Sequence, residues 1–219
     1  NHAQVGWVST QSLIQILLEL RANRVPDVVV FYDGVNDAFA CYQRAEAGIP
    51  ANEFNREAEF GLVRDLRRVR LMALGNPSKT ALGRLAAAIR RRLRHESAPP
   101  PWPQPWTKAF GAQISQANLD SLAREVVRAY EGNARIIQEL GRARGFRPLF
   151  FWQPSVFMKN ALTDREQNAS DQQQELLRRF ALAVHAAVGK SAFLRDSVAF
   201  RNLDLAFAED RGEIFWDWC

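Results

Sequence analysis

The ten residues Val28-Val-Val-Phe-Tyr-Asp-Gly-Val-Asn-Asp37 constrain the fold of this chain more than any other stretch. They begin as an unbroken apolar run, mostly β-branched and aromatic, which is typical of a strand buried on both faces of a sheet. The run stops at Asp33-Gly34, where glycine allows a tight turn. Asn36 and Asp37 are then expected just beyond the carboxyl end of the strand, where ligands bind in open α/β sheets. An ordinary turn uses the same residue types. These ten residues alone therefore do not distinguish a ligand-binding loop from a structural turn, and the rest of the chain is needed.

Helical and strand patterns alternate along the chain, which predicts an α/β domain with a parallel sheet. The remaining strands are expected at about 147–153 and 198–204. Helices are expected from Ser9 or Thr10 to about Arg24, and over 116–144 and 163–188. A mostly helical insertion at about 38–113 interrupts the alternation. It ends in a Pro-rich stretch, 98–106, that should be extended.

The length and composition indicate a globular protein with one good core or two small ones. The chain has 219 residues, 47% of them hydrophobic and 24% charged, and no apolar run of transmembrane length. Its two cysteines, Cys41 and Cys219, are too few for a disulfide framework and lack metal-site spacing. We therefore expect no metal and no cofactor. The cellular compartment stays open.

The positive charge of the chain is concentrated in one segment. Residues 61–95 hold ten Lys and Arg side chains against Asp65, a net charge of +9, so the remainder carries −4 within the total of +5. One interpretation is the solvated outer face of an inserted helix. The other is a surface that docks an anionic membrane or a polyanion such as a glycan or nucleic acid, although nucleic acid is not the expected partner.

Three short patterns occur in a fixed order along the chain: Asn1-x-x-x-x-Gly6, then Gly34-Val-Asn-Asp37 after the first predicted strand, then Asp217-Trp-Cys219. Their order and setting resemble the SGNH hydrolases, the GDSL-type esterase and lipase superfamily. In that family the second sequence block carries a glycine, the third reads Gly-x-Asn-Asp, and the fifth reads Asp-x-x-His. The stretch 150–155, Phe-Phe-Trp-Gln-Pro-Ser, also looks like bacterial members of the family.

The resemblance implies a fold and a reaction. The fold is a three-layer α/β/α sandwich with a flavodoxin-like parallel sheet. The reaction is hydrolysis of a carboxylic ester, an acyl or acetyl group on a lipid, a glycan or a small molecule, through a Ser-His-Asp triad. The Gly6 N–H and the Asn36 side-chain amide would stabilise the oxyanion. Asp217 would be the triad acid, and Asp37 is expected to hold its loop.

Two catalytic residues of the family pattern are absent from the printed sequence. The Gly-Asp-Ser block would precede Asn1, and the histidine of Asp-x-x-His would be residue 220. No other serine or histidine fits these positions. Ser9 and Ser155 read as helix-start and turn residues, and His185 as a packing or surface residue. We therefore expect a single hydrolase domain, incomplete at both ends and inactive by itself. The alternative is a non-catalytic binding module that uses segment 61–95.

Overall fold

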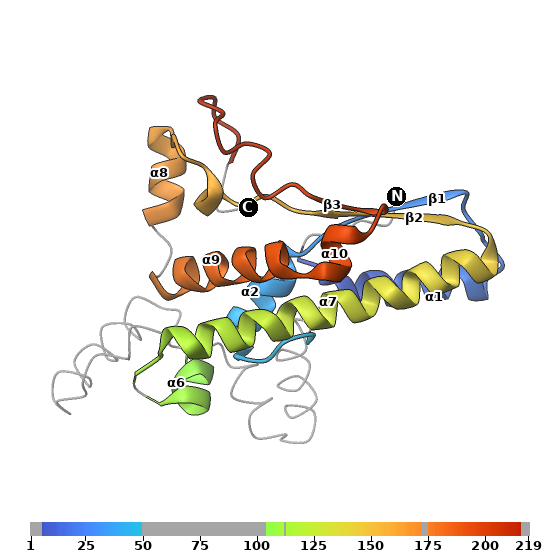
Figure 1. The fold of residues 1–219 in the computed structure, drawn as a ribbon, viewed down its shortest axis with the longest axis horizontal. Coiled ribbons are helices and arrows are strands. Elements are labelled where there is room, and N and C mark those ends of the chain that lie inside the picture. Colours follow the sequence, from blue (N-terminus) through green and yellow to red (C-terminus); the bar gives the residue numbers. More distant parts are fainter. Residues whose placement is uncertain (1–5, 50–103, 112, 172–174, 216–219) are drawn as a thin grey trace, which may run out of the picture. The chain divides into compact units, whose positions relative to one another are not determined.

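The computed structural model describes residues 6–49, 104–111, 113–171 and 175–215. All of them belong to one compact unit, built from the chain on either side of segment 52–101. Its strands are β1 (Val28–Asp33), β2 (Arg147–Trp152) and β3 (Phe200–Asn202). Its helices, shown in Figure 1, are α1 (Ser9–Arg21), α2 (Val35–Arg44), α6 (Gln104–Phe110), α7 (Gln116–Arg144), α8 (Asp164–Asp171), α9 (Glu175–Lys190) and α10 (Ala192–Asp196), with a 3-10 turn η2 (Val156–Met158).

The three strands form one parallel sheet in the order β1-β2-β3. The register sets Asp33 opposite Trp152, and Trp152 opposite Asn202. The carboxyl ends of all three strands therefore reach the same edge of the sheet. The expected strand positions, their parallel pairing and their order are confirmed.

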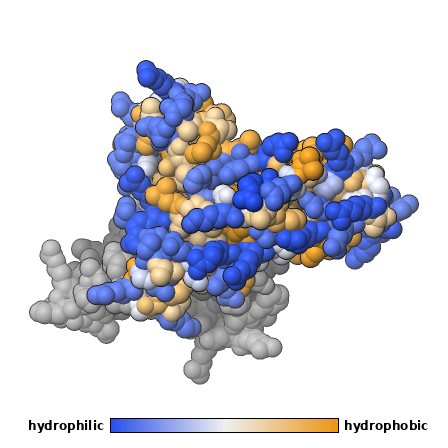
Figure 2. Space-filling model, viewed as in Figure 1, coloured by the Kyte–Doolittle hydropathy of each residue, from blue (hydrophilic) through white to orange (hydrophobic). Residues whose placement is uncertain are grey.

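Helices α1, α7, α9 and α10 cover one face of this sheet (Figure 1). Phe31, Phe150 and Phe200, one from each strand, are buried beneath them. The long helix α7 contributes an apolar stripe at helical spacing that includes Leu122, Val126, Val127, Tyr130 and Ile137. Its outward side carries charged residues, and the surface in Figure 2 is mainly hydrophilic. Among the described residues, the core thus lies between the sheet and one helical layer.

The side chains on the other face of β1 are about half exposed, which corrects the expectation that this strand is buried on both faces. Val28, Val30 and Tyr32 are 51%, 59% and 52% exposed, while Phe31 between them is buried. An apolar run does not reveal how many of its faces are covered, so the sequence could not show this. The α/β class with a parallel sheet holds. Among the described residues, the second helical layer of the predicted sandwich is not found.

Two helical predictions also need correction. The helix expected over 163–188 is two helices, α8 and α9, with 172–174 outside the described ranges. Trp106 lies in helix α6 rather than in extended chain, and it is fully buried against Tyr42 and Phe180. This indole therefore belongs to the core.

Most of the insertion, including the basic segment 61–95, lies outside the described residues. Only α2 and α6, at its two ends, are seen. Within the parts of the chain that the structure covers, no helix has the length and apolar character to cross a membrane.

Candidate functional site

The carboxyl edge of the sheet gathers polar residues directly after β1. Gly34 makes the turn with φ of +115°, and a Cβ built there would lie 2.5 Å from the ring of Trp152 at the end of β2. Both the backbone conformation and the close approach require glycine. Helix α2 begins at the next residue, which puts Asn36 and Asp37 in its first turn. Asn36 is partly exposed and Asp37 is buried.

Asp37 joins this turn to the start of α1. Its carboxylate accepts hydrogen bonds from the backbone N–H of Ser9, at 3.0 and 3.2 Å, and from the Ser9 hydroxyl. On the other side of Ser9, the Asn133 side-chain amide of α7 donates to the hydroxyls of Ser9 and Thr10, at 2.9 and 3.0 Å. Asp37 therefore has a structural role: backbone groups of its own turn, at Gly34 and Asp37, interact with its carboxylate, and so does Ser9, 28 residues earlier in the chain.

Burial governs the electrostatics at this edge. Burial raises the pKa of Asp37 to about 6, although hydrogen bonds from Ser9 oppose the rise. Burial, followed by the nearby negative charge of Asp37, raises the pKa of Asp33 to about 7, against a hydrogen bond from the Ser12 hydroxyl. Two carboxyl groups thus lie in a poorly solvated region and repel each other, so ionising both is unfavourable.

Contacts in the structure connect the two segments that contain Gly6 and Asn36, two of the three predicted site residues. Gly6, exposed and with φ of +80°, lies three residues before Ser9. Asn36 is adjacent to Asp37 in sequence. The Ser9–Asp37 contact therefore holds together the two segments that carry the predicted oxyanion donors. Asp217 lies outside the described residues, and its position relative to Asn36 stays a prediction.

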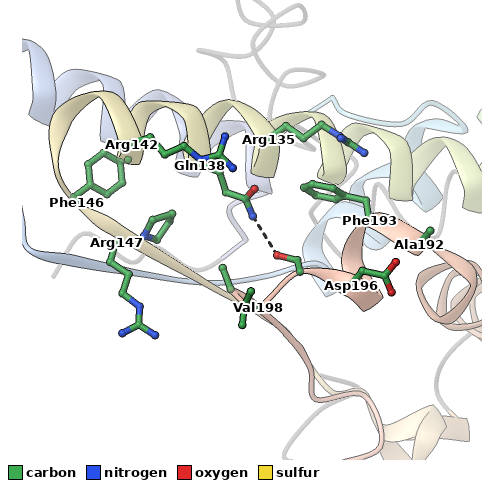
Figure 3. A pocket seen from close by; sticks show the side chains of 13 residues that line it. Arg135, Gln138, Arg142, Phe146, Arg147, Ala192, Phe193, Asp196 and Val198 are labelled. Carbon is green, nitrogen blue, oxygen red and sulfur yellow. Dashed lines mark hydrogen bonds between the residues drawn. The ribbon is translucent and has the colours of Figure 1, made fainter.

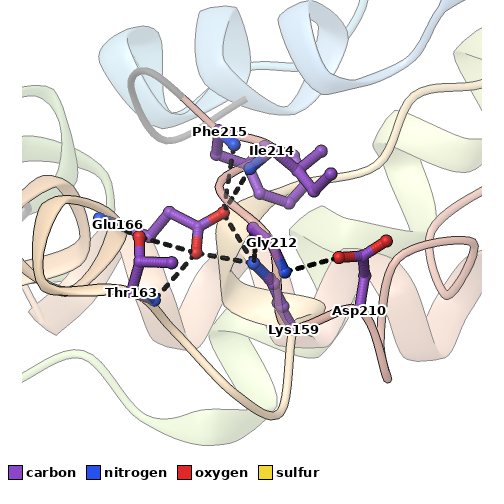
Figure 4. Close-up of polar contacts among 7 residues, drawn as sticks. All are labelled: Lys159, Thr163, Glu166, Asp210, Gly212, Ile214 and Phe215. Carbon is purple, nitrogen blue, oxygen red and sulfur yellow. Dashed lines mark hydrogen bonds and ion pairs between the residues drawn. The ribbon is translucent and has the colours of Figure 1, made fainter.

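A buried ion pair beyond β2 was not anticipated from the sequence. Lys159 Nζ lies 2.6 and 2.8 Å from the carboxylate oxygens of Glu166, and both side chains are completely buried (Figure 4). Burial by itself would raise the pKa of Glu166, but hydrogen bonds from Lys159 and from three backbone N–H groups lower it to about 2. The sequence did carry a signal, because Thr163-x-x-Glu166 is a capping-box pattern. Thr163 N–H donates to Glu166 at 2.9 Å.

A second missed pair is His185 with Asp204. Nδ1 of His185 lies 2.7 Å from the carboxylate of Asp204, which is buried just after β3. This hydrogen bond raises the pKa of His185. A histidine oriented by a buried carboxylate is one element of a catalytic triad. No serine hydroxyl of the described ranges bonds this histidine, so the pair alone does not make a nucleophilic site.

A cavity lined by described residues lies at the opposite end of the sheet. It has a volume of about 810 Å³ and lies beside the start of β2, between α7 and α10 (Figure 3). Arg135, Arg142 and Arg147 line it together with Asp196. The Arg135 guanidinium stacks on the Phe193 ring at 3.8 Å, and the Gln138 amide donates to the Ser197 hydroxyl across it. Because the candidate residues follow the carboxyl ends of the strands, this cavity is not their substrate pocket.

The described residues contain no group of three or more His, Cys, Asp or Glu side chains placed to hold a metal ion. Comparison of the chain with protein-family models, with curated proteins and with solved structures finds no match in any of the three. The candidate site therefore depends on the residues and contacts above.

Proposed function

We propose that this chain is part of a serine ester hydrolase with an SGNH-type fold. In this proposal the Gly6 N–H and the Asn36 side-chain amide stabilise the tetrahedral oxyanion. Asp217 orients the histidine that activates the serine. The serine and the histidine come from residues outside Asn1–Cys219. The substrate is a carboxylic ester, because a serine nucleophile and oxyanion donors suit acyl transfer.

The strongest support for the proposal is the contact between Ser9 and Asp37. The Ser9–Asp37 hydrogen bonds connect the segment after Gly6 to the turn that presents Asn36. These two segments lie far apart in sequence, and the bond between them is buried. An oxyanion hole needs donors fixed before the reaction begins, and a buried carboxylate that bridges the two donor segments supplies such fixation.

The sheet gives independent support. The carboxyl ends of the three parallel strands share one edge, and Asn36 lies one turn beyond β1 at that edge. Val28, Val30 and Tyr32, each about half exposed, lie together on the other face of β1. Such a surface suits a further structural layer, as the three-layer sandwich would have.

The experiment starts from the coding sequence, extended in both directions to the nearest start and stop codons. The extended protein should hydrolyse a small activated ester such as 4-nitrophenyl acetate, whereas the 219-residue chain should match a denatured control. Asn36→Ala should lower kcat by about 10²–10³, the usual loss for one oxyanion donor. Asn168→Ala, an exposed asparagine of α8, is the matched control and should leave kcat unchanged. A neutral Asn36→Ala would refute the proposal.

The alternative, a binding module that uses segment 61–95, concerns residues outside the described ranges. No observation on the described residues favours it. It would gain support if the extended protein hydrolysed no ester but bound vesicles containing anionic lipid.

A further inference from the structure

The cavity beside the start of β2 takes no part in the ester chemistry proposed above. Its walls come from α7, from the start of β2, and from α10 with the residues that follow it (Figure 3). All of its lining residues belong to the described ranges. Its volume of about 810 Å³ is in the range of small-molecule sites, about 300–1,000 Å³. The side chains that line it therefore indicate what kind of molecule it can bind.

One face of α7 supplies a row of polar side chains to this cavity. Arg135, Gln138 and Arg142 are spaced three and four residues apart, which places them on the same side of the helix. The two arginines are two helical turns apart, so their Cα atoms are separated by about 10 Å along the helix axis. The row therefore offers N–H donors along the whole α7 side of the cavity.

The positive charge of the cavity is not neutralised by the residues around it. Asp196, the acidic residue of the lining, is paired with Arg195 at 3.0 Å. Arg135 lies 3.8 Å from Glu131 one turn earlier in α7, and the Arg135 side chain is 54% exposed. Arg142 makes no ion pair with any described residue. Such an excess of positive charge in a concave surface attracts anions.

The cavity also has apolar walls. Phe146 and Pro148 line it near the start of β2, and Phe193 lines it from α10. The Arg135 guanidinium stacks on the Phe193 ring, 3.8 Å from its centre, which restrains both side chains. Val198, 88% exposed, is the most exposed large apolar side chain of the described ranges. A ligand with an apolar body would cover it, and burial of apolar area favours binding.

Contacts within the chain hold the walls together. The Gln138 amide donates to the Ser197 hydroxyl at 3.2 Å, as Figure 3 shows. A Cβ at Gly141 would lie 2.7 Å from the Phe146 carbonyl oxygen and 3.0 Å from the Pro148 ring. The absence of that Cβ lets the end of α7 approach β2 closely. The cavity is thus preformed, which lowers the entropic cost of binding a ligand.

We propose that this cavity binds an organic phosphate monoester whose body is apolar. Arg142 and the second N–H of the Gln138 amide bind the phosphate oxygens, and the body packs against Phe193 and Val198. Three lining arginines against one aspartate give the cavity a net charge of +2. This charge matches the charge of about −1.5 to −2 that a phosphate monoester carries at pH 7. The inference does not depend on the proposed esterase activity.

The first test measures binding of naphthyl phosphate to the 219-residue chain by isothermal titration calorimetry at low salt. This probe joins a phosphate to a bicyclic apolar body, and we expect a Kd below about 1 mM. Inorganic phosphate and naphthol each supply one half of the probe and should bind at least about tenfold more weakly. Naphthoate, which carries a single negative charge, should bind at least about threefold more weakly. Tighter binding of naphthoate or naphthol than of naphthyl phosphate would overturn the inference.

Substitutions around the cavity identify the side chains that bind the probe. Arg142→Gln should raise the Kd at least about tenfold, because a charged donor to the phosphate is lost. Val198→Ser should raise it about three- to fivefold through lost apolar contact. The matched control is Arg128→Gln, an exposed arginine of α7 outside the cavity lining, which should change the Kd by less than about twofold. All three side chains are exposed, so urea midpoints should stay close to that of the parent.

Arg147 separates a specific phosphate site from a general positive potential. It lines the cavity, but its side chain points away from Arg142 and Gln138 (Figure 3). Arg147→Gln should therefore raise the Kd by less than about threefold. If Arg147→Gln or Arg128→Gln weakens binding as much as Arg142→Gln does, only general positive charge attracts the anion and the inference fails. It fails equally if the parent chain shows no measurable binding of naphthyl phosphate.

Discussion

Asp37 accepts hydrogen bonds from both the backbone N–H and the hydroxyl of Ser9, a residue 28 positions earlier in the chain. The bonds connect the amino-terminal ends of α1 and α2, which begin at Ser9 and Val35. A negative charge near two helix N-termini is favourable, because the unpaired N–H groups there carry partial positive charge. Asp37 therefore organises the edge of the sheet without having to contact substrate.

The Ser9 hydroxyl should contribute measurably to stability. Ser9→Ala leaves the backbone N–H in place but removes a buried hydroxyl that bonds both Asp37 and Asn133. The free energy of unfolding should fall by about 1–3 kcal/mol, because the buried Asp37 and the partly buried Asn133 each lose a partner. Urea unfolding measures this. Ser121→Ala, an exposed serine of α7, should change stability by less than about 0.5 kcal/mol. Equal effects of the two substitutions would contradict the prediction.

Gly34 should tolerate no side chain. Gly34→Ala forces a non-glycine residue to φ of +115° and drives its Cβ into the Trp152 ring. Backbone strain and overpacking together should cost about 2–5 kcal/mol. Gly132→Ala is the matched control, since a Cβ there meets nothing within 4 Å and the position lies inside α7. It should stabilise the protein by about 0.4–1 kcal/mol. Thermal unfolding that shifts in the same direction for both variants would disprove this account.

The strands were the most predictable part of the fold. β1 and β2 begin and end within one residue of the expected positions, because each is an apolar run closed by turn residues. Parallel pairing followed from the helices between the strands. Helix α7 matched its expected bounds, since Ser115 caps its start and Gly145, with φ of +84°, ends it.

The contacts that build the candidate site were less predictable. Asp37 was expected to act structurally, but its partner Ser9 is brought near only by the tertiary fold. The prediction that both faces of β1 are buried was wrong. An apolar sequence shows that a strand can be buried, but it does not show which element covers each face. The Lys159–Glu166 ion pair was missed although Thr163-x-x-Glu166 is visible in the sequence, since a capping box does not indicate burial or predict a bond to Ile214.

The paired carboxyls at the sheet edge should make stability depend on pH. The folded-state pKa of Asp33, about 7, is raised above its ordinary value of 3.8, chiefly by burial. The folded state therefore binds the proton more tightly. This contribution is fully present below pH 3.8 and is lost as the pH rises to about 7. Asp33→Asn, which resembles the protonated form, should gain stability relative to the parent as the pH rises from 4.5 to 8.

The matched control for this pH dependence is Asp27→Asn, an exposed carboxyl just before β1. Denaturant midpoints across the pH range should change relative to the parent only for Asp33→Asn. If the stability difference between Asp33→Asn and the parent does not change with pH, folding does not raise the pKa of Asp33.

Lys159 and Glu166 should make coupled contributions to the free energy of unfolding. Glu166→Leu or Lys159→Met alone leaves one buried group without its partner, and each should cost about 3–5 kcal/mol. The double replacement should cost much less than the sum, because neither charge is then buried unpaired. A double-mutant cycle measured by urea unfolding gives the coupling energy. Additive losses would mean that the two groups do not stabilise each other.

The His185–Asp204 pair is the alternative to Asp217 and its expected histidine as the base and acid of the triad. The bond to Asp204 raises the pKa of His185, so the stabilisation is present below about pH 6.5 and is lost as the pH rises through the higher folded-state value. His185→Gln should therefore destabilise the protein more at pH 6 than at pH 9. It should also leave kcat of the extended esterase within about threefold, because no described serine bonds this histidine. Loss of a triad histidine costs on the order of 10⁶ in kcat. A loss of that size in His185→Gln would assign the base to His185 and remove Asp217 from the site.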